Sequence, residues 1–216
     1  MSPLDPKVFS RILAFWSLLL ISAAASALEE RSDALVQALQ KGGYVIFIRH
    51  AGTNRDHKDT DIRDLTNCTT QRNLTERGRE QSKLIGEGFA ALGIPVGEVL
   101  TSEYCRCFDT AQIAFGRATR VKSLSSYIPV PPAEKQQRVQ SIRRMLNTLP
   151  SSGSNTVIVS HHEMFRDASG IALVEGEAAI FKPTPTGSQL IARIVAEGWP
   201  SVVKQYLATH AAPSAR

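Results

Sequence analysis

The sequence feature that most constrains the fold is a run of five apolar or aromatic residues, Tyr44 to Ile48, that ends directly in Arg49 and His50. A short run of this kind predicts a buried strand. One interpretation of the two polar residues is a solvated loop at the point where the strand reaches the surface. The other is a ligand site, since α/β proteins form their binding crevices at the carboxyl ends of parallel strands. The rest of the chain decides between the two.

The same pattern occurs again near residue 160. A β-branched strand from Thr156 to Val159 is followed by Ser160 and then by His161 and His162. Between these two strands, predicted helices alternate with further short strands. This alternation predicts an α/β fold, a three-layer sandwich in which helices flank a mostly parallel central sheet.

Periodicity and capping residues predict the remaining elements. Thr75 is the expected N-cap of a helix over 74–93, and Gly93 is its stop signal. The other expected helices span 103–116, 134–150 and 199–210, the last with Pro200 in its first turn. Strands are expected at 98–102 and 119–124, with two more around a turn within 178–195, and residues 60–73 are expected to form a polar loop.

Residues 1–27 have the pattern of a secretory signal peptide. Lys7 and Arg11 precede a ten-residue apolar stretch over 12–21, and Ala25 to Ala27 form a small-x-small cleavage pattern. The alternative is an uncleaved anchor, but ten apolar residues fall well short of the ~20 that span a bilayer. We therefore expect a secreted or periplasmic protein with one domain over 28–216.

Removal of this segment takes two basic side chains and one acidic side chain from the totals of 25 and 20, which leaves 23 and 19 and a formal net charge of +4. The cations are scattered, and only Arg143 and Arg144 are adjacent. A chain without a basic tract is not typical of nucleic-acid-binding proteins. The remaining sequence also contains no second segment apolar enough to span a membrane.

Export changes how the three cysteines are interpreted, because disulfides form in oxidising compartments. Cys105 and Cys107 lie two residues apart on a predicted helix, where they cannot bridge each other. The residues alone leave a Cys68–Cys105 or a Cys68–Cys107 disulfide. Zinc is the third alternative, but one C-x-C pair and one distant cysteine lack the spacing of structural zinc sites.

Three segments place polar side chains at what should be one edge of the sheet: Arg49 with His50, the stretch "TSEYCRC" with Arg106, and His161 with His162. An arginine at the start of a helix suits an anion. A phosphoryl group in transfer needs cations around its oxygens and a nucleophile in line with its leaving group. A neutral imidazole can be that nucleophile without losing a proton. The pattern therefore predicts phosphoryl transfer.

Four motifs in order resemble the histidine phosphatase superfamily, also called the phosphoglycerate mutase-like family. They are "IRHAGT", "LTERGREQSKLIG", "VLTSEYCRCFDTAQ" and "VIVSHHEM". The resemblance covers most of the mature chain, and "GEAAIFKPT" fits the family's late hairpin. It implies that His50 is the residue phosphorylated, that Arg49 and Arg106 clamp the phosphate, and that His161 is a second pocket histidine. It implies no metal and no cofactor.

The chain also departs from the family pattern. Glu103 replaces the usual proline and Cys107 the usual alanine, and both lie beside Arg106, where they could alter the cleft. Cys107 could equally be an inert residue in a helix face. His162 falls where relatives have glycine or asparagine, so we expect it outside the pocket. Thr53 is expected to support the pocket, and Glu103 to contribute to the substrate site. His57 and His210 belong to no motif, and we expect them to be solvated.

The general acid that relatives carry some two dozen residues after the second arginine is missing. That region here reads "LSSYIPVPP", without a carboxylate. The remaining candidates are Glu134, Glu103 and Asp56.

The sequence therefore predicts a metal-independent phosphatase that forms a phosphohistidine. The alternative is a catalytically idle phosphate-binding protein of the same fold. The expected partner is a small phosphorylated substrate or a phosphorylated envelope component, and phosphohistidine on proteins is a further substrate class within the family.

Of the two possible disulfides, we expect the one that joins Cys68 to Cys105, which leaves Cys107 free. Cys68 lies in the long loop after His50, and Cys105 immediately precedes Arg106. This pairing would attach the loop to the segment that positions the arginine. Related exported proteins with cysteines at these two places add limited support.

Overall fold

The computed structural model of the chain describes residues 30–126 and 130–210. The predicted signal peptide, residues 1–27, lies outside the described residues. Among the helices that are described, none combines the length and the hydrophobicity needed to cross a bilayer.

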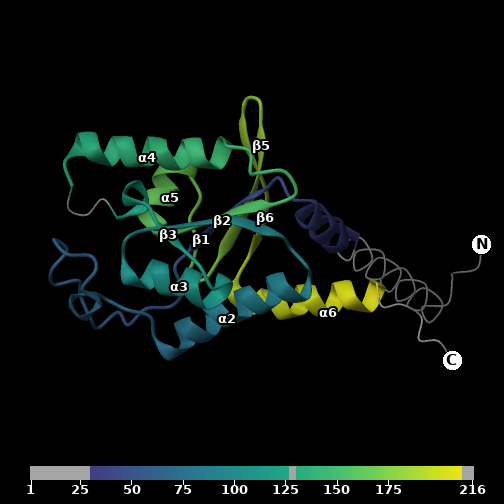
Figure 1. Cartoon of the computed structure of the whole chain (residues 1–216), viewed down its shortest axis with the longest axis horizontal. Coiled ribbons are helices and arrows are strands. Elements are labelled where there is room, and N and C mark those ends of the chain that lie inside the picture. The colour runs from purple at the N-terminus through teal and green to yellow at the C-terminus, as the bar shows by residue number, and fades with distance from the viewer. Residues whose placement is uncertain (1–29, 127–129, 211–216) are drawn as a thin grey trace, which may run out of the picture.

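Six strands form one sheet in the order β3-β2-β4-β1-β5-β6 (Figure 1). They are β1 (Val45–Arg49), β2 (Val96–Thr101), β3 (Thr119–Arg120), β4 (Asn155–Ser160), β5 (Ala178–Thr184) and β6 (Gly187–Ile194). The first four in this order are mutually parallel, whereas β5 and β6 are antiparallel to their neighbours. The sheet is therefore mostly parallel, as predicted.

Helices cover both faces of the sheet. Residues 30–41 are helical, and the other helices are α2 (Glu76–Ala91), α3 (Cys105–Phe115), α4 (Pro132–Asn147), α5 (His162–Ser169) and α6 (Trp199–His210). Short 3-10 turns occur at Cys68–Thr70, Lys122–Leu124 and Ala196–Gly198. Figure 1 shows α4 and α5 on one face of the sheet and α2, α3 and α6 on the other. This is the predicted three-layer sandwich.

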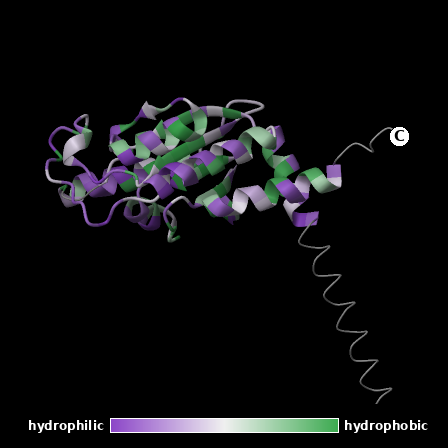
Figure 2. Ribbon diagram, turned by 90° about the horizontal axis from the view of Figure 1, so that it is seen from below, coloured by the Kyte–Doolittle hydropathy of each residue, from purple (hydrophilic) through white to green (hydrophobic). Residues whose placement is uncertain are grey.

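The central strand β1 is buried on both sides because its side chains alternate between two cores. Val45 and Phe47 belong to the core beneath α4 and α5, where Phe47 stacks on Phe165 with 4.2 Å between ring centroids. Ile46 and Ile48 belong to the core on the opposite face. Figure 2 shows the result as hydrophobic strands between helices of mixed character. Burial on both faces explains why this stretch is apolar throughout.

Several predicted boundaries are confirmed. Thr75 caps α2, and its hydroxyl accepts a hydrogen bond from the Gly78 N–H at 3.0 Å. Gly116 ends α3 in the left-handed region, with φ of 68°. The two strands expected within 178–195 are β5 and β6.

Three expectations about the elements need correction. The strand expected at 119–124 is confined to Thr119–Arg120, and the chain then turns through a 3-10 helix. The helix over 30–41 and the helix α5 have no counterpart in the prediction. The helix over 30–41 follows closely on the predicted cleavage site, and α5 starts at the second histidine of "SHHEM".

Candidate active site

The ends of β1 and β4 bring two histidines together. The strands pair in parallel with Arg49 opposite Ser160, so His50 and His161 follow at adjacent strand ends. The backbone N–H of His50 continues the ladder by donating to the Ser160 carbonyl at 3.0 Å. The two imidazole rings lie 5.6 Å apart at an angle of 67°. Polar residues at these strand ends therefore form one site rather than two solvated loops.

The ring of His50 is held in one orientation. Its Nδ1 lies 2.9 Å from the Ala51 carbonyl oxygen, and because a carbonyl only accepts, Nδ1 carries the proton. The Ala51 N–H in turn donates to Thr110 Oγ1 on α3 at 3.1 Å. Nε2 of His50 is left with a lone pair. This is the tautomer that a nucleophilic imidazole needs.

His161 is oriented by a serine. Ser102 Oγ lies 2.7 Å from His161 Nε2 and accepts the Tyr104 N–H at 3.2 Å. The Ser102 hydroxyl also donates to Ser125 Oγ at 3.5 Å. Ser102 therefore holds the His161 ring in one orientation.

Burial lowers the pKa of both histidines well below 6.5. His50 is 2% exposed and His161 is 1% exposed. The positive charge of Arg106 is the second cause in each case, and Arg49 and Arg72 add to it. Both imidazoles are therefore neutral near pH 7, which keeps the lone pair of His50 free.

The His50–His161 pair should make the stability of the folded chain depend on pH. Because the pKa of each histidine is lower in the folded chain, the unfolded chain binds more protons below its own pKa of 6.5. The free energy of unfolding should therefore decrease as the pH falls through about 6.5, by up to about 1.4 kcal/mol per pH unit for each histidine. Urea unfolding at about pH 7.5 and about pH 5.5 measures the decrease, which should be about 1 kcal/mol smaller in His161→Gln. Equal decreases in both proteins would contradict this explanation.

Three arginines surround the histidine pair. The Nε atoms of Arg49, Arg72 and Arg106 are all buried, and none has a hydrogen-bond partner in the described residues. Unmatched buried donors on charged groups are costly, so they are typical of sites that a ligand completes. Guanidinium groups suit the oxygens of a phosphate or a related anion. The three side chains together are called the arginine cluster below.

Other contacts hold the arginine cluster in place. Arg49 donates to the Leu173 carbonyl at 2.9 Å and lies 3.5 Å from Glu175. Arg106 is paired with Asp59 at 3.0 Å, and its guanidinium lies 4.3 Å above the ring of Tyr104. Both side chains are thus fixed before a ligand arrives. The sequence analysis missed Arg72, a single arginine in a polar loop with no motif around it.

Hydrogen bonds join the segment after His50, in the motif "IRHAGT", to the start of α2, in the motif "LTERGREQSKLIG". The Gly52 N–H donates to Gln81 on α2 at 2.9 Å, and the Thr75 N–H donates to the Gly52 carbonyl at 3.0 Å. A Cβ atom at Gly78 would overlap that same carbonyl oxygen. Glycine is therefore required at 78 so that the start of α2 can lie against the loop after His50.

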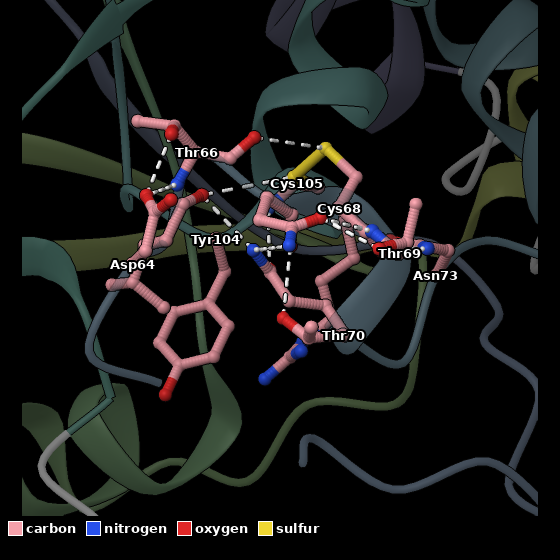
Figure 3. Close-up of a disulfide and its surroundings, with 12 residues drawn as sticks. Asp64, Thr66, Cys68, Thr69, Thr70, Asn73, Tyr104 and Cys105 are labelled. Carbon is pink, nitrogen blue, oxygen red and sulfur yellow. Dashed lines mark hydrogen bonds between the residues drawn. A yellow bond between two sulfur atoms is a disulfide. The ribbon is translucent and has the colours of Figure 1, made fainter. Parts of the chain in front are cut away.

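A disulfide attaches the loop over 54–73 to α3. Cys68 and Cys105 are bonded, with 5.7 Å between their Cα atoms (Figure 3). Beside the bond, Gln71 accepts the Cys105 N–H at 3.0 Å. Asp59 accepts the Arg72 N–H at 2.9 Å as well as pairing with Arg106. The loop thus supplies Arg72 to the arginine cluster and holds Arg106, which follows the bonded cysteine.

An open cavity of about 750 Å³ lies over Arg72 and Arg106. Arg72, Tyr104, Arg106 and Glu163 are among its lining residues. Basic side chains of the 54–73 loop line it as well, namely Arg55, His57 and Lys58. A phosphorylated molecule of moderate size could reach the arginine cluster through it.

Two further predicted residues lie near the site. Thr53 is 7% exposed and donates to Glu175 at 2.9 Å, the carboxylate that also faces Arg49. Glu103 accepts from the Ser125 hydroxyl at 3.1 Å and lines an adjoining cavity of about 580 Å³. Thr53 therefore supports Arg49 indirectly, and Glu103 faces the neighbouring cavity.

The other two candidate acids are placed away from the arginine cluster. Glu134 forms an ion pair with Arg138 on α4 and lines the adjoining cavity with Glu103. Asp56 is exposed, and its backbone N–H donates to Asn54 within the loop. Neither carboxylate lines the cavity over Arg106.

Cys107 is buried at 0% exposure, 3.6 Å from His161 Nε2. Burial raises the pKa of its thiol to about 12, so it is not a thiolate at neutral pH.

His162 is half-buried, and its Nδ1 has no hydrogen-bond partner in the described residues. His57 and His210 are exposed.

Within residues 30–126 and 130–210, no three His, Cys, Asp or Glu side chains are grouped so that they could hold a metal ion. The donor set of this site consists of arginines and neutral imidazoles.

One family of known proteins matches part of the chain. The sequence model of the histidine phosphatase superfamily (branch 1) matches residues 45–125, which include His50 and Arg106. The chain is similar to this superfamily over that segment, and its sheet order and paired histidines agree with the phosphoglycerate mutase-like fold.

Two curated relatives match part of the chain. The mitochondrial serine/threonine-protein phosphatases Pgam5 of Drosophila persimilis and Drosophila willistoni are 36% and 34% identical to it over 96 residues. The match covers 41% of this chain and 30% of each relative. The chain therefore matches less than a third of the length of these relatives.

One similar solved structure is that of the protein histidine phosphatase SixA complexed with tungstate. It has 14% sequence identity and a TM-score of 0.52, and the alignment covers 71% of this chain and 97% of that one. At this identity the likeness shows the fold alone.

Proposed function

We propose that this protein is a phosphatase that hydrolyses a phosphomonoester or a phosphoramidate through a phosphohistidine on His50. One observation carries the proposal. A buried neutral histidine with a free Nε2 lies among three arginines whose buried Nε groups lack partners. Such a site offers both the nucleophile and the cations that phosphoryl transfer requires.

Each residue has a definite part in the proposed reaction. The arginine cluster binds the phosphoryl oxygens and neutralises the charge that spreads over them in the transition state. Nε2 of His50 attacks phosphorus while the bond to the leaving group breaks. His161 donates to a phosphoryl oxygen. Water then attacks the phosphorus of the phosphohistidine, which releases phosphate and restores the neutral imidazole.

The cations proposed for this reaction are arginines, so we expect no metal requirement. Purified protein should hydrolyse p-nitrophenyl phosphate, vanadate should inhibit it, and EDTA should leave the rate within about twofold of its starting value. Loss of activity on chelation, restored by zinc or magnesium, would contradict metal independence. Vanadate binding without turnover would instead support the idle phosphate-binding protein.

We also propose that the protein acts after export, on a small phosphorylated molecule or a phosphorylated envelope component. A disulfide beside the site supports an oxidising compartment. The predicted signal peptide supports the same location. Recovery of mature protein starting near residue 28 from the exported fraction would test this.

A further inference from the structure

A second group of basic side chains lines the cavity over the arginine cluster. Arg55, His57 and Lys58 belong to the 54–73 loop, line this cavity and are exposed. The proposed reaction places the transferred phosphoryl group at the arginine cluster and gives these three side chains no part. Residues 55–58 are called the basic segment below.

The acidic side chains in and beside the basic segment do not neutralise it. Residues 55–59 read Arg-Asp-His-Lys-Asp. Asp56 is not among the residues that line the cavity. Asp59 does line it, but its carboxylate is paired with Arg106 at 3.0 Å. The segment therefore presents cations to the cavity without a free carboxylate of its own.

Hydrogen bonds hold the basic segment in this position. The Asn54 carbonyl accepts the His57 N–H at 3.3 Å, and the Asn54 N–H donates to the Asn73 carbonyl at 3.2 Å. At the other end of the segment, Asp59 accepts the Arg72 N–H at 2.9 Å. Both ends are thus attached to residues 72–73, which keeps the segment beside the arginine cluster.

Two cations of the segment have charge available for a ligand. Lys58 forms no ion pair with any residue in the ranges 30–126 and 130–210. Arg55 lies 3.8 Å from Glu175, a carboxylate that Arg49 approaches more closely, at 3.5 Å. Burial lowers the pKa of Arg49, and the positive charge of Arg55 adds to the lowering. Arg55 is therefore close enough to the arginine cluster for the two charges to repel each other, and an anion between them would relieve this repulsion.

We propose that Arg55 and Lys58 form a second anion site and that the substrates are phosphomonoesters that carry a second phosphate group. This inference rests on the proposed function, because the phosphoryl group that is transferred lies at the arginine cluster. Guanidinium and ammonium groups both bind phosphate oxygens. The second phosphate binds at Arg55 and Lys58, is not cleaved, and holds the substrate in one orientation.

Exposed basic side chains on a loop also have an ordinary role, because surface charge keeps a protein soluble without binding a ligand. That role predicts the same affinity for ligands with one and with two phosphate-like groups. Binding measurements with both kinds of ligand therefore separate the two explanations.

The test is isothermal titration calorimetry with methylphosphonate and with diphosphonates that have one, two or three carbons between the phosphorus atoms. Their P–C bonds resist hydrolysis, so binding is measured without turnover. The tightest-binding diphosphonate should bind about tenfold more tightly than methylphosphonate. Lys58→Gln and Arg55→Gln should each reduce this ratio by about threefold, which is within the range of an exposed ion pair.

The matched control is Lys83→Gln, which removes the same charge from α2, where Lys83 pairs with Glu80 at 3.4 Å. This variant should keep the wild-type ratio. Equal affinities for methylphosphonate and the diphosphonates in the wild-type protein would overturn this inference. A ratio that neither Lys58→Gln nor Arg55→Gln reduces, or that Lys83→Gln reduces as much, would overturn it as well.

Turnover of p-nitrophenyl phosphate is measured separately, so that this inference and the proposed function can fail independently. If the protein hydrolyses this ester but shows no preference for diphosphonates, only this inference is overturned. If the preference is present without turnover, the proposed function and the assigned substrates fail, whereas the second anion site stands.

Discussion

Replacement of His50 by alanine should abolish turnover, lowering kcat with p-nitrophenyl phosphate by at least about 10⁴-fold, the scale on which removal of a catalytic nucleophile acts. The reason is that no other group in the described site combines a free lone pair with a position among the arginines. His161 Nε2 is occupied by Ser102, and burial keeps the Cys107 thiol protonated. Steady-state kinetics with purified variants measure the loss.

Two other histidines serve as controls for this prediction. His210→Ala changes an exposed residue in α6 that stacks on Tyr206, and it should retain wild-type kcat. His162→Ala should retain most activity. The His50 variant should still bind vanadate, because the arginine cluster remains. Turnover within tenfold of wild type in His50→Ala would remove this residue from the proposed role.

Loss of the Cys68–Cys105 disulfide should have the second large effect. The bond closes a span with a sequence separation of 37, for which chain-entropy estimates give about 4 kcal/mol. For a domain of this size that corresponds to a decrease in Tm of about 10 °C. Vanadate affinity should fall as well, because the 54–73 loop carries Arg72 and Asp59. Thermal unfolding and vanadate inhibition with and without a reductant measure both changes.

The free cysteine provides the control. Cys107→Ser should keep the disulfide and its response to reductant, whereas Cys68→Ser and Cys105→Ser should behave like the reduced protein. If reduction changes neither Tm nor vanadate affinity, the loop is held by its hydrogen bonds alone and the role given to the disulfide is wrong.

The fold could be predicted largely from the sequence because local patterns and tertiary structure agree. Val45 to Ile48 are buried on both faces, so the strand is apolar throughout, and Thr75 and Gly116 mark helix ends by their own chemistry. The placement of His50 and His161 also followed from strand ends. Parallel neighbouring strands must present the residues after them at the same edge.

The rest of the site depends on tertiary contacts that leave little trace in the sequence. Arg72 lies in a loop that reaches the pocket through the disulfide and Asp59. Glu163 lies on a short helix after a histidine pair, so its place in the lining of the cavity over Arg106 depends on how α5 packs against the sheet. Pairing with Arg138 determines where Glu134 lies, although Glu134 has the right side chain for an acid. Spacing alone could not rank these carboxylates.

The central claim is that phosphorus is bonded to His50 during turnover. The direct measurement is a rapid mixture of protein with excess p-nitrophenyl phosphate, quenched in alkali, digested and mapped by mass spectrometry. Alkaline quenching matters because phosphohistidine is labile to acid. Our account predicts one phosphoryl group on the peptide that contains His50, lost after brief acid treatment and absent in His50→Ala. A phosphoryl group that resists acid, or that maps to His161 or to any other peptide, would contradict it.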